Sequence, residues 1–340
     1  MRVLIVCLAL AVFALLGFVT DPAHGEPSRQ FADSQSSGTS PISACINLGG
    51  ALEAPREGDW GYTVRERDLH RIAQAGFDTI RLPVAWSQHT MRTSPYLIDR
   101  RLLARTDAII SAALDAGLNV ILDVHHYFQL MKQPDAHEAR LDAIWRQLSD
   151  HYEGWPDGLI FEFLNEPHSR MNTARVDAMN ARLLRMVRAR HPDRWVIMGG
   201  AGWGKLDGLL QARIPFDERA ITTFHYYDPF EFTHQGADFD KNAPPKGQKW
   251  GTEVHRQRLE NTMSRARAFR DRVGMPVFLG EFGVYGEVPL VDRAKWTRAV
   301  REAAEASGIG WCYFDWGTSF RLYDLERERW LMSMRHALLP

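Results

Sequence analysis

Two glutamates follow apolar runs that have the composition of buried β-strands. Glu166 ends LIFEFLNE and is followed at once by Pro167, which stops a strand and limits where the carboxylate points. Glu281 likewise stands at the end of an apolar run, PVFLGE. Taken alone, each glutamate is equally well explained as an ion-paired strand end. Together they predict a pair of carboxylates that can divide their roles, one protonated and one ionised.

The segments around these glutamates alternate between strand-like and helix-like patterns from residue 42 onward. Eight such repeats in about 300 residues are the number needed to close a parallel barrel, so we predict an α/β fold with a single (β/α)8 TIM barrel over residues 42–340. A doubly wound open sheet is the alternative, but no glycine-rich phosphate loop follows the first strand. The expected strands are 42–48, 78–84, 118–126, 159–165, 194–200, 220–226, 276–282 and 309–316, and the expected helices are 64–76, 98–116, 137–153, 172–190, 205–211, 253–273, 290–306 and 327–337.

Polar residues cluster where these strands end, which in a parallel barrel is the edge that carries the active site. Two carboxylates at one barrel mouth suit glycoside hydrolysis, which needs an acid for the leaving oxygen and an ionised group for the anomeric carbon. The strand ends offer Asn47, Glu53, Arg81, His125, His126, Asn165, Glu166, Trp203, His225, Tyr227, Glu281, Asp315 and Trp316.

Several ordered motifs resemble glycoside hydrolase family 5, in particular its bacterial endoglucanases and mannan-active members. They are INLGGALEAPREGDWG, GFDTIRLPVAW, LDVHHY, FEFLNEPH, FHYYDPFEFTHQGA and VFLGEFGVY, and the likeness spans roughly residues 44–336. The resemblance implies a retaining endo-β-1,4-glycanase that acts on β-glucan, with mannan or glucomannan as further substrates, and that uses no metal or organic cofactor. An exo-acting β-glucosidase or mannanase of the same family is the alternative.

The resemblance also implies roles for individual residues. Glu166 matches the general acid/base, Glu281 the nucleophile, and Asn165 the group that hydrogen-bonds the sugar 2-hydroxyl. The remaining matches are Arg81 and Tyr227 as groups that orient the nucleophile, His125 and His225 as hydrogen-bonding groups of the cleft, and Glu53, His126 and His234 as sugar contacts.

The chain departs from the family where a tryptophan usually stacks beneath the sugar next to the scissile bond. Phe314 stands at that position in TyrPheAspTrp, just as Gly50 and Phe239 stand where related sequences have Asn and Trp. Because strand side chains repeat every second residue, Trp316 faces the same way as Phe314 and is our hypothesis for the stacking platform. Phe314 and Trp316 are therefore both expected to bind substrate.

Two other classes of function compete with hydrolysis. One is a non-catalytic polysaccharide-binding barrel, which need not keep both glutamates. The other is a barrel enzyme of the carboxylate–metal type, which needs Asp or Glu ligands at several strand ends, where only Asp315 is available to extend such a cluster. His125 and His126 are consecutive on a strand, so we expect them to face opposite ways and not to chelate one ion. The loop 228–250 is expected to wall the leaving-group side, with Phe230, Phe232 and Trp250 as sugar contacts or packing groups.

The near-zero net charge indicates a neutral partner, and the apolar run from Val3 to Thr20 indicates a secreted protein. The formal net charge is −1 and no block of Lys and Arg stands out, so we expect a β-linked polysaccharide or oligosaccharide as partner, neither nucleic acid nor a membrane, and a monomer. Residues 1–25 are expected to be a signal peptide cleaved after Gly25, an uncleaved anchor being the alternative, and the Ser-rich residues 26–41 a disordered tether. The catalytic domain then begins at residue 42.

Three cysteines occur in the chain, and Cys7 lies in the expected signal peptide. Cys45 and Cys312 fall on the first and last expected strands, which become neighbours when the barrel closes. A disulfide between them fits this placement, but we expect buried free thiols.

Overall fold

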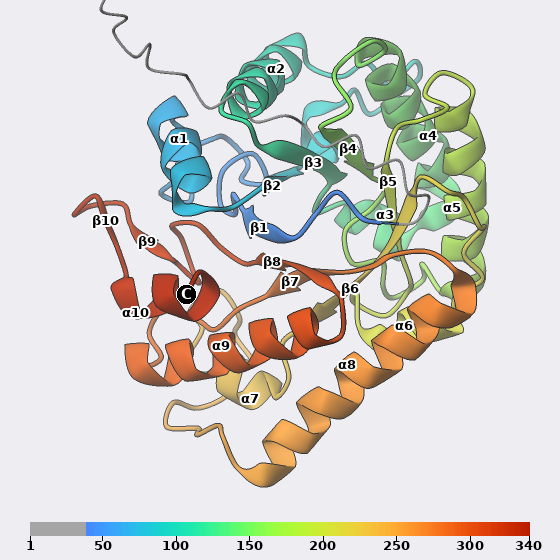
Figure 1. The fold of residues 1–340 in the computed structure, drawn as a ribbon. Coiled ribbons are helices and arrows are strands. Elements are labelled where there is room, and N and C mark those ends of the chain that lie inside the picture. Colours follow the sequence, from blue (N-terminus) through green and yellow to red (C-terminus); the bar gives the residue numbers. More distant parts are fainter. Residues whose placement is uncertain (1–38) are drawn as a thin grey trace, which may run out of the picture. The chain divides into compact units, whose positions relative to one another are not determined.

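A computed structural model describes residues 39–340 and shows a closed barrel of eight parallel strands in chain order, β1 to β8 (Figure 1). The predicted (β/α)8 barrel is therefore confirmed, and β1 pairs with β8 to close it. The strands are β1 (Ala44–Asn47), β2 (Thr79–Val84), β3 (Asn119–Val124), β4 (Leu159–Glu162), β5 (Val196–Gly199), β6 (Ala220–Tyr226), β7 (Val277–Phe282) and β8 (Gly310–Tyr313).

Helices surround the barrel on the outside (Figure 1). Those that follow the strands are α1 (Glu66–Ala75), α2 (Arg100–Asp115), α4 (Pro134–His151), α5 (Thr173–Arg188), α6 (Leu206–Gln211), α8 (Glu253–Val273), α9 (Leu290–Ala306) and α10 (Met332–Leu338). Further short elements, which the sequence patterns did not predict, are the 3-10 helix η1 (Trp86–His89), the helices α3 (Phe128–Lys132) and α7 (Phe230–Thr233), and a hairpin of β9 (Tyr323–Asp324) and β10 (Arg329–Trp330).

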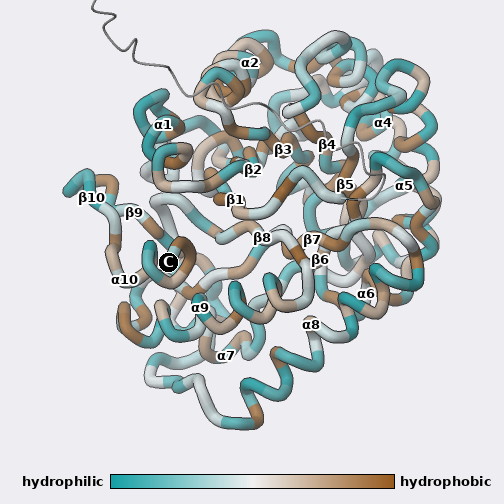
Figure 2. The backbone as a smooth tube through the Cα atoms, in the orientation of Figure 1, coloured by the Kyte–Doolittle hydropathy of each residue, from teal (hydrophilic) through white to brown (hydrophobic). Residues whose placement is uncertain are grey.

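Local chemistry sets where the helices begin and end. The side chain of Thr252 accepts a hydrogen bond from the backbone N–H of His255 at the start of α8, and Gly274 ends this helix with a left-handed φ of 70°. Hydrophilic residues dominate the outer turns of α8, whereas the strands carry the hydrophobic ones (Figure 2). The helices thus bury one stripe against the barrel and leave the other in water.

The inside of the barrel is filled in layers. A separate apolar cluster, drawn almost wholly from the strands, forms the lower layer, and it includes Cys45, Ile121, Ile160, Ile221 and Phe278. A polar layer lies above it, because side chains two residues further along a strand share the same face. Its members are Asn47, Asp123, Glu162 and Thr223.

One irregularity in β7 changes which way its last residues face. His225 of β6 pairs with Glu281, whereas strict pairing after Phe224 and Leu279 would set it against Gly280. The extra residue is a β-bulge, which re-aims the side chains that follow it. Gly280 fits because a Cβ there would lie 2.6 Å from the Thr223 hydroxyl oxygen. The bulge lets Glu281 reach the cleft, although plain alternation from Phe278 would turn it outward.

Cys45 and Cys312 form a disulfide, which corrects our expectation of free thiols. The two residues are register partners on β1 and β8, and their Cα atoms lie 4.1 Å apart. Both side chains are completely buried. The bond therefore ties the first strand covalently to the last one inside the closed barrel.

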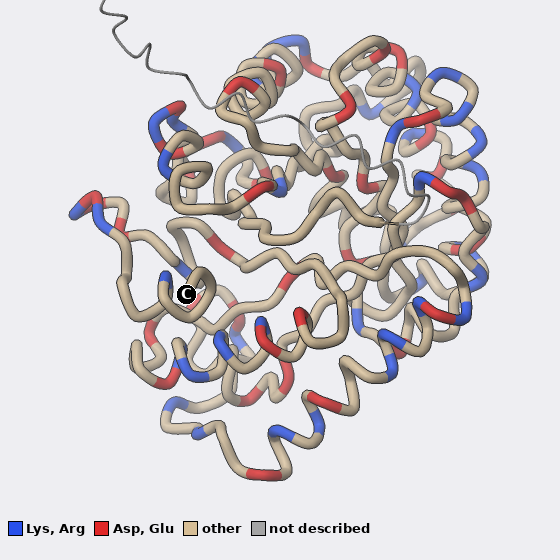
Figure 3. Tube along the Cα trace, in the orientation of Figure 1, with Lys and Arg blue, Asp and Glu red and all other residues tan. Residues whose placement is uncertain are grey.

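Residues 39–340 fall within one compact unit. None of the helices in this range is long and apolar enough to cross a bilayer. Basic and acidic residues are interspersed over the outer helices (Figure 3). The predicted signal peptide and nearly all of the predicted tether lie outside the described residues.

Candidate active site

A cleft of about 1010 Å³ opens at the carboxyl ends of the strands. Most of the site residues predicted from the sequence line it, and Arg81 lies buried beneath it. The predicted residues in its wall are Glu53, His125, His126, Asn165, Glu166, His225, Tyr227, His234, Glu281 and Phe314.

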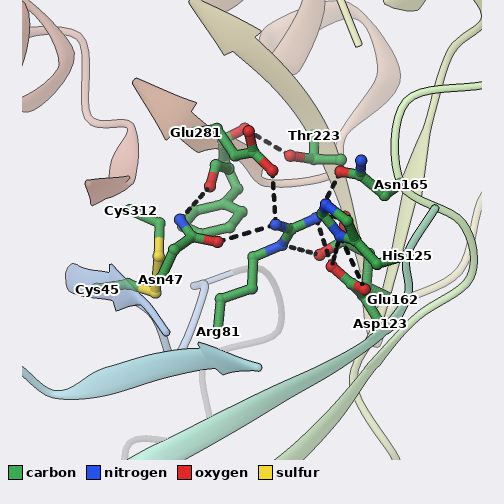
Figure 4. A network of polar contacts seen from close by, with 12 residues as sticks. Cys45, Asn47, Arg81, Asp123, His125, Glu162, Asn165, Thr223, Glu281 and Cys312 are labelled. Carbon is green, nitrogen blue, oxygen red and sulfur yellow. Dashed lines mark hydrogen bonds and ion pairs between the residues drawn. A yellow bond between two sulfur atoms is a disulfide. The ribbon is translucent and has the colours of Figure 1, made fainter. Parts of the chain in front are cut away.

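The Arg81 guanidinium is the centre of the polar layer and is completely buried (Figure 4). On one side it meets Glu162 through two hydrogen bonds, at 2.7 Å from Nε and 2.9 Å from Nη2. A carboxylate oxygen of Asp123 lies 2.6 Å from Nη2. These two carboxylates compensate the buried positive charge and hold the guanidinium plane in place.

On the other side Arg81 meets the groups that face the cleft. Its Nη1 donates to Glu281 Oε1 at 2.7 Å, and its Nη2 donates to Asn165 Oδ1 at 2.8 Å (Figure 4). Because Arg81 occupies the amide oxygen, Asn165 is left with its NH2 group as the donor for a ligand in the cleft. This is the polarity that a bond to a sugar hydroxyl oxygen requires.

Glu281 is held as an anion. Burial raises the pKa of its carboxyl, but the positive charges of His225 and Arg81 and the hydrogen bond from Tyr227 outweigh burial and lower it to about 2. The Tyr227 hydroxyl donates to Glu281 Oε2 at 2.9 Å. Each carboxylate oxygen thus has a donor, and the group is ionised at neutral pH as a nucleophile must be.

His225 connects the two glutamates. Its Nδ1 lies 2.7 Å from Glu166 Oε1 and 3.6 Å from Glu281 Oε2, and one oxygen of each carboxylate lies within 4.8 Å of the other. Burial lowers the pKa of the imidazole, but the two carboxylates reverse this and raise it above its ordinary value. Glu166 is the more accessible acid, with a side chain 24% exposed against 7% for Glu281. Glu281 is therefore the more buried of the two glutamates, and both of its carboxylate oxygens accept hydrogen bonds.

The bulge at Gly280 gives a first prediction. We expect Gly280→Ala to lower kcat about 100-fold, because the added methyl group must displace Thr223 or His225 and shift Glu281 by a fraction of an ångström. Steady-state kinetics on a soluble β-glucan measures the effect, and circular dichroism controls for folding. Unchanged kcat in a folded Gly280→Ala protein would show that the bulge does not position the nucleophile.

Glu53 and His125 form a second polar group at the cleft wall. Glu53 Oε1 accepts from the backbone N–H of Gly50 at 2.7 Å, and Oε2 lies 3.3 Å from His125 Nε2. Burial raises the pKa of the Glu53 carboxyl to about 8, and the charges of Glu281 and Asp123 add to the rise. Glu53 is therefore a neutral acid at pH 7.

The buried acid predicts a pH-dependent stability. Between about pH 4.5 and pH 8 the unfolded chain releases the Glu53 proton while the folded protein keeps it, so folding stability falls as pH rises through this window. We expect Glu53→Gln, which is neutral at every pH, to remove that part of the decline. Urea unfolding at pH 5 and pH 8 for both proteins checks it. An equal fall in the free energy of unfolding from pH 5 to pH 8 in the wild type and in Glu53→Gln would contradict the raised pKa.

His126 lies beside His125, which corrects the expectation that the two rings face opposite ways. Strand β3 ends at Val124, so alternation does not extend to this pair, and His126 has a left-handed φ of 51°. The ring centroids are 4.5 Å apart. Both imidazoles border the cleft.

Trp316 does not face the cleft, so the hypothesis that it replaces the missing stacking platform is wrong. It is fully buried and stacks on Tyr323 with ring centroids 4.5 Å apart. The period-two argument fails because β8 already ends at Tyr313. Phe314 is the partly exposed ring at this position, and it lines the cleft.

The observed positions of Phe314 and Trp316 predict different effects of replacing each ring. We expect Phe314→Ala to raise KM about five- to tenfold through loss of an aromatic surface. Trp316→Ala is expected to lower the free energy of unfolding by about 3–5 kcal/mol, because it empties a buried site. Kinetics and urea unfolding of both variants separate the effects. A larger KM change for Trp316→Ala than for Phe314→Ala would contradict the structure.

Aromatic side chains extend the cleft away from the two glutamates. In the loop 228–250, Phe230 lines the cleft and stacks on His234, whereas Phe232 and Trp250 are buried packing groups. Four further aromatic residues line the cleft that were not predicted as sugar contacts: Trp60, Phe128, Trp203 and Phe239. Trp203 stands at a predicted strand end and Phe239 where related sequences have Trp, whereas no predicted strand or helix includes Trp60 or Phe128.

Comparisons with known proteins agree with this site. The family model described as Cellulase (glycosyl hydrolase family 5) matches residues 39–319. Endoglucanase H of Acetivibrio thermocellus is 34% identical over 271 residues, which are 80% of this chain and 29% of the relative. Endoglucanase A of Ruminococcus albus is 28% identical and is matched over 77% of this chain and 78% of its own length. This chain thus spans less than a third of the length of Endoglucanase H.

Solved structures show the same likeness in three dimensions. Thermotoga maritima Cel5A in complex with mannotriose superposes with a TM-score of 0.85 at 34% identity, covering 88% of this chain and 97% of that one. A hyperthermophilic endo-β-1,4-glucanase in complex with substrate superposes with a TM-score of 0.86 at 33% identity, covering 88% of this chain and 96% of that one. With the family model, the barrel and the paired glutamates in agreement, the chain belongs to glycoside hydrolase family 5.

Proposed function

We propose that this chain is a retaining endo-β-1,4-glycanase that hydrolyses β-glucan and also accepts mannan or glucomannan. The observation that carries the proposal is the close approach of Glu166 and Glu281, whose nearest oxygens lie within 4.8 Å. Retaining glycosidases hold their two carboxyl groups about 5–5.5 Å apart, and inverting ones leave a wider gap for water. The spacing favours direct attack by a carboxylate.

The two glutamates have different roles in the proposed reaction. Glu281, held ionised by Arg81 and Tyr227, attacks the anomeric carbon while Glu166 gives a proton to the leaving oxygen. The bond from the anomeric carbon to that oxygen breaks, and an ester with Glu281 forms. Glu166, which has given up its proton in the first step, then takes a proton from the water that hydrolyses the ester.

The cleft itself favours a chain-like substrate. Its volume of about 1010 Å³ is at the upper end for small-molecule sites, and aromatic rings stand at several places along it. Flat rings bind the apolar faces of sugars and need no charge on the ligand. The aromatic residues of the cleft therefore suit a neutral oligosaccharide.

Product analysis on a panel of soluble β-glucans and β-mannans tests the proposal. We expect rapid loss of viscosity with a mixture of short oligosaccharides, and no products from Glu281→Gln. Release of single sugars with unchanged viscosity would favour the exo-acting alternative. No hydrolysis of any β-glycan by the folded wild-type chain would contradict the proposal and favour a binding barrel.

We also propose that residues 1–25 direct export, that 26–41 tether the domain, and that the mature protein is a secreted monomer. The Cys45–Cys312 disulfide supports this, because such bonds persist in oxidising compartments. Mass spectrometry of protein from a secreting bacterial host is expected to give a chain that starts at Glu26. A cell-bound chain of full mass would contradict the proposal.

A further inference from the structure

A second trio of metal-ligating side chains lies in the cleft wall beside the reaction centre. One ligand atom from each of Glu53, His125 and His126 lies within 4.8 Å of the others. Glu53 and His125 are buried, and His126 is partly exposed to the cleft. Two imidazoles and one carboxylate are a ligand set that proteins use for zinc, and an ion that binds here displaces the proton that the Glu53 carboxyl carries at pH 7.

His125 is oriented as a zinc ligand is. Its Nδ1 lies 3.0 Å from a carboxylate oxygen of Asp123, so that nitrogen carries the proton and Nε2 keeps its lone pair. A zinc-bound histidine usually binds the metal through one ring nitrogen and donates the N–H of the other to a carboxylate. Here the lone pair of Nε2 is directed at Glu53.

One carboxyl oxygen of Glu53 has no hydrogen-bond partner among residues 39–340. Oε1 accepts from the backbone N–H of Gly50, whereas the buried Oε2 lies 3.3 Å from His125 Nε2 without forming a hydrogen bond to any described residue. Two ligands of a tetrahedral zinc ion, each bonded at about 2.0–2.1 Å, lie about 3.3–3.4 Å apart. The distance between the oxygen and the nitrogen is therefore the one that a shared ion would impose.

His126 supplies the third ligand from the cleft side. Phe128 stacks on its ring at 5.2 Å with planes 17° apart, and Trp60 meets it edge-on at 5.8 Å. One ring nitrogen of His126 lies within 4.8 Å of the ligand atoms of Glu53 and His125, so the imidazole completes the trio from the side of the cleft.

The reaction centre offers a competing trio of the same type, Glu166, His225 and Glu281. Its ligand atoms are already engaged, because His225 Nδ1 is 2.7 Å from Glu166 and the Glu281 oxygens accept from Arg81 and Tyr227. An ion there would have to break these contacts. In the Glu53 trio, by contrast, Oε2 of Glu53 has no hydrogen bond to a described residue that an ion would have to break.

We propose that Glu53, His125 and His126 bind one divalent transition-metal ion, zinc above all, with the fourth position open to the cleft. The ion takes no part in the two-glutamate reaction. It occupies the wall where a sugar ring passes, so metal and glycan exclude each other. On the function proposed above, zinc is a reversible inhibitor of the enzyme.

Calorimetric titration of the untagged full chain with zinc chloride at neutral pH tests the site without relying on activity. We expect one ion per chain, and at least about tenfold weaker binding for Glu53→Gln and for His126→Asn. Two control variants should bind as the wild type does: Glu281→Gln from the competing trio, and His151→Asn, which removes a surface imidazole paired with Asp107. Loss of binding in Glu281→Gln with retention in Glu53→Gln would overturn the proposal.

Anomalous diffraction at the zinc edge provides a measurement on the unaltered chain. The expected result is a peak about 2.0–2.2 Å from Glu53 Oε2 and the two imidazoles. A peak at Glu281, peaks at surface residues only, or no uptake at millimolar zinc would overturn the site. Because neither experiment measures hydrolysis, the zinc site can fail while the proposed function stands, and the reverse also holds.

Discussion

Replacing Glu281 with glutamine is expected to lower kcat on a soluble β-glucan by about 10⁴-fold or more, the order of loss seen when a covalent nucleophile is removed. Glutamine has nearly the same shape and still accepts a hydrogen bond from Arg81. The loss therefore reports the missing charge and nucleophile rather than a collapsed site. Steady-state kinetics with reducing-sugar detection measures it.

The matched control is Glu231→Gln, which changes an exposed glutamate of α7 outside the network around Arg81. It should hydrolyse the same substrate at the wild-type rate. If folded Glu281→Gln kept activity within tenfold of wild type, Glu281 would not be the nucleophile.

Replacing Glu166 with glutamine is expected to lower kcat on polysaccharide by about 10²–10⁴-fold, the usual contribution of general acid–base catalysis. The loss should depend on the leaving group. A dinitrophenolate departs without a proton, so the first chemical step on a dinitrophenyl cellobioside should proceed at nearly the wild-type rate. Stopped-flow detection of the dinitrophenolate burst measures this step.

Glu166→Gln should then accumulate the glycosyl ester on Glu281, because it lacks the base that activates water. Mass spectrometry of the quenched protein detects the added sugar mass. If Glu166→Gln lost the same rate on polysaccharide and on the dinitrophenyl cellobioside, with no dinitrophenolate burst, Glu166 would not be the acid/base.

The different roles of the two glutamates come from their surroundings rather than from their own chemistry. Glu281 lies on the bulge of β7, beside the guanidinium of Arg81 and the phenol of Tyr227, and is almost fully buried. Glu166 lies four residues beyond the end of β4, and its Oε1 lies 2.7 Å from His225 Nδ1. The guanidinium and the phenol donor keep Glu281 an anion despite its burial, whereas the carboxyl of Glu166 is partly exposed to water.

Much of the fold follows from patterns in the sequence. Apolar runs and turn residues placed all eight strands of the barrel, and α8 and α9 begin and end where their apolar periodicity and flanking Thr252, Gly274 and Pro289 indicate. Short elements such as α3 and α7 have too few residues to show a period. Their presence could not be predicted.

The parts of the site that were mispredicted share one physical cause. Alternation along a strand holds only while the strand lasts, and the cleft residues lie at or beyond strand ends. His126, with its left-handed backbone, turns toward His125, and Trp316 turns into the core beyond β8. The bulge at Gly280 has the opposite effect, since it brings Glu281 inward against plain alternation.

The Cys45–Cys312 bond shows a similar limit. Their pairing across β1 and β8 could be anticipated from barrel closure, but whether the thiols are oxidised depends on a side-chain distance that no sequence pattern gives. Geometry of this kind becomes visible only in the folded structure.

The central claim is that Glu281 attacks the anomeric carbon directly, with the Glu166 carboxyl too close to admit a water between carboxylate and sugar. Proton NMR of the sugar released first, recorded before mutarotation, tests this most directly. Retention predicts that the β-anomer appears first and the α-anomer grows in later. An initial α-anomer would show inversion through an activated water and would contradict the account.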